Sequence, residues 1–230
     1  MITPEDLKKE AEEIEKELYE TKEEIKDTKK PIYFLIAMIL IFSMILWIVP
    51  NYSVKIDPRP HYIPKYEEVI PNWLNSENLT DIEPKNHNDY LLLYRPNDPQ
   101  IKYIADMIVQ KSCEPNHICH AKAIFEFLKQ NFNYVNDPII GDYVKDPIRI
   151  IETRSGDCED ASILLINLLG AVGIRTRLVF IPGHVYVQAY LPDAHKKYHT
   201  DGWVSLDLTC QPCNFGNSIK REGPKIIVEV

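Results

Sequence analysis

The sequence predicts an α+β domain, with helices packed on an antiparallel sheet, that follows an N-terminal helix and one transmembrane helix. Three observations lead to this fold class: a charge-free run at residues 32–49, helical periodicity between residues 100 and 131, and strand-like alternation after residue 176. Helices that precede strands along a chain favour an α+β arrangement over a doubly wound sheet. The 230 residues, 45% of them hydrophobic, suffice for one core with appendages.

Composition narrows the classes of partner. The net charge is −8, the isoelectric point is near 5.4, and the lysines are interspersed with acidic residues. This pattern lacks the basic footprint of a nucleic-acid-binding protein, so no nucleic acid is expected as a partner. The chain also has no loop with regularly spaced carboxylates for calcium, and no cofactor is expected.

Residues 1–30 are expected to form a charged cytoplasmic helix, with the helix itself over residues 3–28. Its apolar positions alternate at spacings of four and three, which is the pattern of a coiled-coil seam and predicts a homo-oligomer through residues 3–28. Three heptads are marginal in water, so a solvated helix that extends the membrane helix is the alternative. The seam positions are Leu7, Ala11, Ile14, Leu18, Thr21 and Ile25.

Residues 31–50 are expected to form a transmembrane helix. The charge-free run within them is about as long as a helix needs to cross a hydrocarbon core of roughly 30 Å. Tyr33 and Trp47 lie near its ends, as interfacial anchors do. No cleavage pattern follows the run, which favours an uncleaved signal anchor over a signal peptide. Because Lys29 and Lys30 adjoin its N-terminal side, we expect a single-pass cell-membrane protein with a cytoplasmic N-terminus and an extracytoplasmic C-terminal domain.

Residues 51–99 are rich in proline and are expected to form a linker or an extended wrap on the surface. The folded domain is then expected over residues 100–230. Apolar spacing predicts its helices and alternation predicts its strands. The expected helices are residues 100–111, 120–131 and 161–169, and the expected strands are residues 177–181, 185–191, 203–208 and 226–230, with a loop at 192–200.

A candidate nucleophile lies at Cys158, within the sequence Gly-Asp-Cys-Glu-Asp at residues 156–160. An apolar helix follows directly, so the cysteine is placed at a helix start, where free N–H groups and the helix dipole favour a thiolate. His184 and Asp207 lie in later strand-like stretches. They supply the two partners that a nucleophilic cysteine needs, a base and a group that orients the base.

These three segments, in this order, resemble the transglutaminase-like superfamily. The resemblance covers about residues 100–210 and includes Arg154-Ser155-Gly156 before the cysteine, the Gly173 turn into the first strand, and Trp203 shortly before the aspartate. It implies a papain-like catalytic triad in which Cys158 is the nucleophile, His184 the base and Asp207 the orienting residue. The family includes members that hydrolyse amide bonds, members that transfer acyl groups, and members that have lost catalysis.

The function expected is therefore a membrane-anchored cysteine hydrolase that cleaves amide or isopeptide bonds of proteins or cell-envelope peptides. An acyltransferase with the same triad is one alternative, and a non-catalytic binding or scaffold domain is the other. The backbone N–H of Cys158 is the expected oxyanion donor, and the sequence identifies no second donor. Glu159 and Asp160 are expected to favour the helix start electrostatically, with Arg154 or Arg175 as the arginine considered for Asp160.

Four further cysteines form two clusters, and their even number outside the cytoplasm favours two disulfides. A link within the second cluster closes a short loop that stabilises little, so links between the clusters are preferred. One zinc ion bound by all four, with His117 or His120 as substitutes, and free thiols are the alternatives. The clusters are Cys113 with Cys119, and Cys210 with Cys213.

Overall fold

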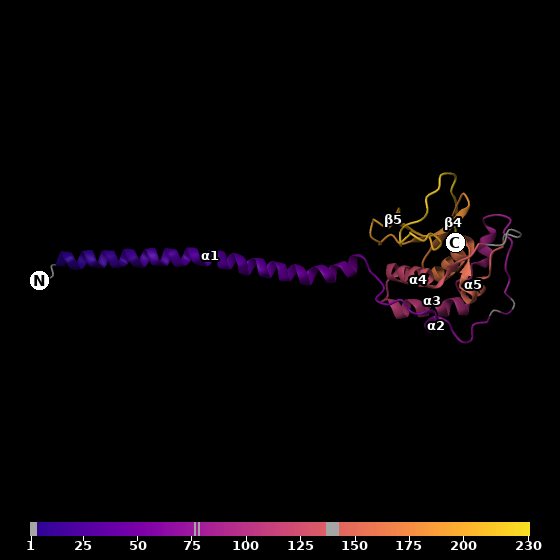
Figure 1. The fold of residues 1–230 in the computed structure, drawn as a ribbon, viewed down its shortest axis with the longest axis horizontal. Coiled ribbons are helices and arrows are strands. Elements are labelled where there is room, and N and C mark those ends of the chain that lie inside the picture. The colour runs from indigo at the N-terminus through magenta and orange to yellow at the C-terminus, as the bar shows by residue number, and fades with distance from the viewer. Residues whose placement is uncertain (1–3, 76, 78, 137–142) are drawn as a thin grey trace. The chain divides into compact units, whose positions relative to one another are not determined.

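A computed structural model describes residues 4–75, 77, 79–136 and 143–230, apart from the side chains at residues 4–7, 23–30 and 50–56 (Figure 1). The chain divides into two compact units, Met1–Ser53 and Val54–Val230. Each unit is described by itself.

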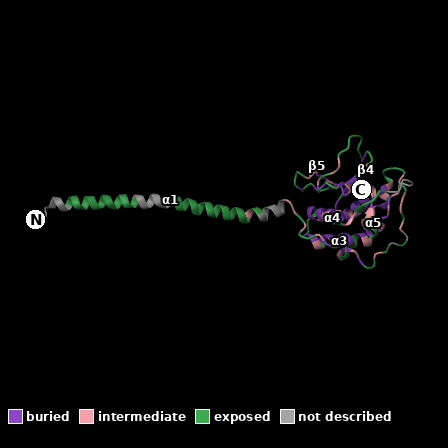
Figure 2. Ribbon diagram, in the orientation of Figure 1, coloured by how far each residue is buried: buried purple, intermediate pink, exposed green. Residues whose placement is uncertain are grey.

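The first unit is built on a single helix, α1 (Pro4–Ile56). Its apolar stretch, Pro31–Val49, has 19 residues, none of them buried, and is long and apolar enough to cross a membrane (Figure 2). Such a helix near the N-terminus fits a signal anchor or a signal peptide. From residue 4 onward, the helix expected at residues 3–28 and the one expected at residues 31–50 lie within one continuous helix; residue 3 is outside the described part of the chain. Association through residues 3–28 stays a prediction.

From Val54 onward the proline-rich segment belongs to the second unit, and parts of it pack into the core of that unit. It contains the short helix α2 (Tyr66–Val69) and the 3-10 helix η1 (Asp89–Leu93). Val69 and Leu93 are buried in the main hydrophobic cluster, so this part of the chain contributes apolar area to the fold. An isolated antiparallel β-bridge between Ile82 and Val144 also joins this segment to the residues that precede Pro147.

The four longer helices of this unit each begin at an Asp or Asn cap. The side chain of the cap accepts hydrogen bonds from the N–H groups that open the helix, which satisfies donors that lack a partner inside it. The last of them is the central element, because it packs against the other three and against the sheet. The helices are α3 (Pro99–Ser112), α4 (His117–Asn131), α5 (Pro147–Thr153) and α6 (Cys158–Ala171).

Five antiparallel strands form the main sheet, in the order β5-β6-β4-β3-β7. One face of the sheet packs against the helices through residues such as Leu178, Val187 and Leu206, which are fully buried. The predicted α+β fold class is therefore confirmed. The strands are β3 (Thr176–Ile181), β4 (His184–Tyr190), β5 (His199–Thr200), β6 (Trp203–Leu206) and β7 (Ile226–Glu229).

A second, two-stranded sheet lies next to the start of α6. Its strands, β1 (Asn133–Tyr134) and β2 (Ser155–Gly156), pair in parallel, with Tyr134 opposite Gly156. This pairing brings Tyr134 to the start of the helix that carries Cys158. The sequence patterns did not predict α2, η1, α5, β1 or β2, and the loop expected at residues 192–200 contains the short strand β5. Short elements carry too few residues to show a period.

Candidate active site

Cys158 is the first residue of α6, and its thiol is free and half-buried. The preceding residue, Asp157, caps the helix by accepting hydrogen bonds from the N–H groups of Glu159 (2.9 Å) and Asp160 (3.1 Å). The buried apolar body of α6 anchors this end of the helix against α3, α4 and β4. The sequence thus fixes the sulfur at the end of a rigid element, as expected.

The protonation state of this cysteine differs from the expectation. The pKa of the Cys158 thiol is raised to about 11, chiefly by burial and also by the neighbouring carboxylates of Asp157 and Glu159. The backbone N–H groups of Val185 and of Cys158 itself lower the pKa without offsetting these effects. The expected resting thiolate at the helix start was therefore wrong, because burial and two local negative charges outweigh the helix dipole.

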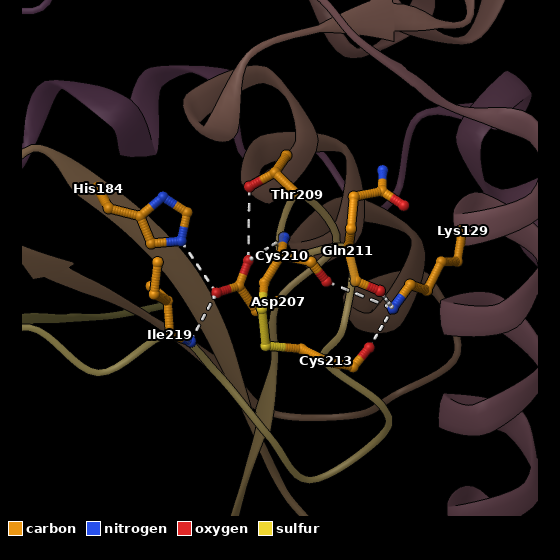
Figure 3. Close-up of a disulfide and its surroundings, with 8 residues drawn as sticks. All are labelled: Lys129, His184, Asp207, Thr209, Cys210, Gln211, Cys213 and Ile219. Atoms are coloured by element: carbon orange, nitrogen blue, oxygen red, sulfur yellow. Dashed lines mark hydrogen bonds and ion pairs between the residues drawn. A yellow bond between two sulfur atoms is a disulfide. The ribbon is translucent and has the colours of Figure 1, made fainter.

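His184 and Asp207 form a close pair. His184 opens β4, and Asp207 directly follows the last residue of β6, so antiparallel pairing of these two strands brings the side chains together. The Nε2 atom of His184 lies 2.9 Å from Oδ2 of Asp207 (Figure 3). Only 9% of the His184 side chain and 1% of the Asp207 side chain are exposed. Water therefore competes little for this contact.

Asp207 is held as a carboxylate. Burial opposes its charge, but hydrogen bonds and charge interaction with His184, together with the backbone N–H groups of Ile219 and Cys210, outweigh that cost and lower its pKa. Because a carboxylate only accepts hydrogen bonds, Nε2 of His184 carries the proton in this contact. The other ring nitrogen, Nδ1, then has the free lone pair whenever the imidazole is neutral.

Cys158 and His184 both line a cavity of about 510 Å³. Among the described side chains, no hydrogen bond or ion pair joins the two residues directly. The thiol does lie close to the histidine in the fold, because the backbone N–H of the next residue, Val185, lowers its pKa. The structure therefore places the three predicted residues in one region, with the His184–Asp207 contact formed.

The cavity also has walls that sequence reasoning missed. They come from the proline-rich segment before α3, from β1 and from the end of β3, none of which carries a motif. Only the polar turn at residues 85–88 gave a local signal, and nothing in it points to a cleft. The residues concerned are Pro84, Lys85, Asn86, His87, Tyr90, Tyr134, Phe180, Ile181 and Gly183.

Residues 102–208 match the family model of the transglutaminase-like superfamily. The chain contains a transglutaminase-like superfamily domain. The matched range includes α4, α6 and strands β3 to β6, and with them Cys158, His184 and Asp207. No curated protein matches the chain.

Several solved structures are similar to this domain. Calcium-bound LapG of Legionella pneumophila is 26% identical over 41% of this chain and 54% of its own, with a TM-score of 0.33. A candidate cysteine protease from Cytophaga hutchinsonii is 19% identical, over 55% of this chain and 44% of its own, with a TM-score of 0.37. A candidate protease from Parabacteroides distasonis is 18% identical, over 47% and 28%, with a TM-score of 0.36. The chain thus spans about half the length of LapG in that match.

Asp160 is bound by a lysine, not by an arginine. Its side chain is fully buried, and Oδ2 lies 2.5 Å from the Nζ of Lys145, whose backbone N–H also donates to Oδ1 at 2.8 Å. The two arginines considered from the sequence lie over aromatic rings instead, Arg154 over Tyr66 and Arg175 over aromatic residues of the sheet. Asp160 therefore ties the start of α6 to the segment before α5.

The four remaining cysteines form two disulfides, but each lies within a cluster. Cys113 pairs with Cys119, and Cys210 pairs with Cys213. The preferred links between clusters are therefore wrong, whereas the zinc site made from all four cysteines stays a prediction. The reason is geometric: the turn within each cluster holds the Cα atoms 6.0 Å and 5.3 Å apart, inside the range that a disulfide spans. The preference for links between clusters rested on loop entropy, which does not depend on how close the folded turn holds the two cysteines.

Proposed function

We propose that this chain is a membrane-anchored, transglutaminase-like cysteine hydrolase that cleaves amide or isopeptide bonds of proteins or cell-envelope peptides. The observation that carries the proposal is the His184–Asp207 contact beside the cavity that Cys158 lines. The match of residues 102–208 to the superfamily supports the same assignment.

In the proposed mechanism, Cys158 attacks as a thiol that loses its proton during the attack. Because its pKa is about 11, few molecules hold a thiolate near neutral pH. Nδ1 of His184 accepts the proton as Sγ bonds to the carbonyl carbon, and the negative charge of Asp207 stabilises the imidazolium that results. The imidazolium then donates the proton to the departing amine, which leaves a thioester on Cys158.

Water completes the reaction by attacking the thioester with His184 as base, which releases the acid and restores the thiol. The backbone N–H of Cys158 is the proposed donor to the oxyanion, because it lies at the free N-terminal end of α6. If an amine attacks in place of water, the same site is an acyltransferase. No observation favours the amine, so hydrolysis is the function proposed.

The location proposed is outside the cytoplasmic membrane, with α1 as the anchor and the N-terminus inside. The apolar stretch of α1 and the lysines before it support this orientation. The two disulfides support it independently, because disulfides persist mainly in oxidising compartments.

Acylation of Cys158 tests the proposal on the full chain in detergent. The chain is treated with p-nitrophenyl acetate at neutral pH, and acetyl-enzyme is followed by intact mass and peptide mapping. His184→Ala should slow acylation at Cys158 by about 100-fold or more, because general-base catalysis contributes that much. His87→Ala is the matched control, since His87 lines the same cavity without contacting Asp207, and it should acylate at the wild-type rate.

Two results decide the assignment. If acylation at Cys158 is as fast in His184→Ala as in the wild type, the proposal that this chain is an enzyme is overturned and the non-catalytic binding domain is supported. If acylation depends on His184 but the acetyl group leaves only after addition of a primary amine, the protein is an acyltransferase and not a hydrolase.

A further inference from the structure

Four contacts from described residues hold the Asp207 carboxylate in one orientation. Oδ2 faces Nε2 of His184 and accepts from the N–H of Ile219 at 3.1 Å. Oδ1 accepts from the N–H of Cys210 at 3.1 Å and from the hydroxyl of Thr209 at 3.4 Å. The oxygen that does not touch the imidazole is therefore fixed by the short turn that follows Asp207, and the geometry of that turn decides where the carboxylate points.

A covalent bond closes this turn. Cys210 and Cys213 form a disulfide, and the N–H of Cys213 donates to the carbonyl of Cys210 at 3.0 Å. Cys210 thus has two roles at once: its N–H binds Asp207, and its side chain is half of the cross-link (Figure 3). Both cysteines are almost fully buried.

A lysine from another element holds the opposite side of the turn. The Nζ of Lys129, in the last turn of α4, donates to the carbonyl oxygens of Cys210 (3.4 Å), Gln211 (3.2 Å) and Cys213 (Figure 3). An ammonium group has three N–H donors, and here three backbone carbonyls receive them. The turn is thus tied to a core helix on one side and to Asp207 on the other.

We propose that the Cys210–Cys213 disulfide and Lys129 are positioning groups for the active site. Together they hold the turn that aims Asp207 at His184, and reduction of the disulfide releases the turn and slows catalysis. The proposal rests on the function proposed above and adds a redox control to it. The reductant is a dithiol: it supplies two electrons and two protons, the S–S bond breaks into two thiols, and the dithiol becomes its own disulfide.

The other disulfide provides an internal contrast. Cys113–Cys119 joins the end of α3 to the first turn of α4, and none of the hydrogen bonds of Asp207 comes from that connection. Reduction of Cys113–Cys119 therefore should not alter the site. The nucleophile is itself a free thiol and gains nothing from stronger reduction once it is reduced.

The test compares the full chain in detergent, before and after dithiothreitol, with two double variants. These are Cys210→Ser/Cys213→Ser and, as the matched control, Cys113→Ser/Cys119→Ser. Two quantities are measured: the acylation and deacylation rates at Cys158, and the titration of Asp207 by carbon NMR of aspartate-labelled protein, assigned with Asp207→Asn. The second measurement needs no catalysis.

Loss of the 210–213 disulfide should raise the pKa of Asp207 toward its ordinary value, because the N–H of Cys210 is no longer held against it. The acylation rate should fall about 10- to 100-fold, as expected for a misplaced catalytic constellation. Dithiothreitol should slow acylation of the wild type and of the Cys113→Ser/Cys119→Ser control to the same extent. It should not slow acylation of Cys210→Ser/Cys213→Ser further.

Lys129 offers a second route if the double variant does not fold. Lys129→Met should change the Asp207 titration and the acylation rate in the same directions, and Lys129→Arg should restore both, because guanidinium also donates to several carbonyls. An unchanged titration and rate in reduced wild type and in Lys129→Met would overturn the proposal. A shifted Asp207 titration together with acylation indifferent to His184→Ala would instead refute the proposed function and leave the positioning role standing.

Discussion

The Lys145–Asp160 ion pair gives the sharpest test of how the start of α6 is held. Asp160 lies two residues after Cys158 with its side chain fully buried, and the Lys145 side chain is only 15% exposed. Lys145→Met keeps the length of the side chain but removes its ammonium group. The substitution leaves a buried carboxylate without the cation that lies 2.5 Å from it.

The magnitude follows from what remains around Asp160. Removing one partner of a buried ion pair typically costs about 3–5 kcal/mol. The backbone N–H of Lys145 still donates to Oδ1, and the N-terminus of α6 favours a negative charge by about 0.3–1 kcal/mol, so part of the loss is offset. We expect the free energy of unfolding to fall by about 2–3 kcal/mol, which for a unit of this size lowers Tm by roughly 5–10 °C.

The assay is thermal unfolding of the full chain in detergent, followed by near-ultraviolet circular dichroism, which reports the aromatic core and not α1. Lys102→Met is the matched control: Lys102 pairs with Asp106 one helical turn away, but the two side chains are 46% and 35% exposed. That pair should contribute less than about 0.5 kcal/mol. Equal Tm shifts for Lys145→Met and Lys102→Met would refute the argument from burial. Lys145→Met/Asp160→Asn should recover part of the loss, because it removes the buried negative charge that Lys145 neutralises in the wild type.

Three further expectations test other parts of the second unit. Gly156→Ala should destabilise it by about 1–3 kcal/mol in chemical unfolding, since the new Cβ would clash with the side chain of Asp160. Burial opposes the charge of Asp57, but hydrogen bonds from Lys122 and Tyr198 outweigh it and lower the pKa to about 2. The charge of Asp57 should therefore add about 2 kcal/mol to the free energy of unfolding above pH 4, and this stability should be lost as pH falls through 2. In urea titrations, Asp57→Asn should lower stability at pH 7 but hardly at pH 2. Peptide mapping without reduction should recover one disulfide within residues 113–119 and one within 210–213, and any link between the clusters would contradict the fold.

The parts of this fold that sequence predicted are those with a local signal. The periods of α3, α4 and α6 and the alternation of β3, β4 and β6 appear in the chain, and their structural bounds differ from the expected ones by a few residues. The placement of His184 near Asp207 followed from a family resemblance. Physically it depends on antiparallel pairing of β4 with β6, which no single segment encodes.

The parts that sequence missed depend on tertiary position. The partner of Asp160 is a lysine fifteen residues earlier in the chain, and neither residue carries a pattern that points to the other. The disulfide pairing was missed because turn geometry, not loop length, decides which sulfurs meet. The thiol pKa was missed because the helix start was visible in the sequence while the depth of burial at Cys158 was not.

The two perturbed groups of the site argue for one direction of proton transfer. Raising the thiol pKa from 9.0 to about 11 makes the Cys158 thiolate less favourable by about 3 kcal/mol, whereas Asp207 is held as a carboxylate by its hydrogen bonds. A charged Asp207 requires the proton of a neutral imidazole to sit on Nε2, so Nδ1 is the nitrogen that can receive a proton. The resting site then holds a neutral thiol, and the fixed negative charge of Asp207 lies behind His184. Charge separates only when a carbonyl is present to accept the sulfur, so an electrophilic substrate is needed before the nucleophile forms.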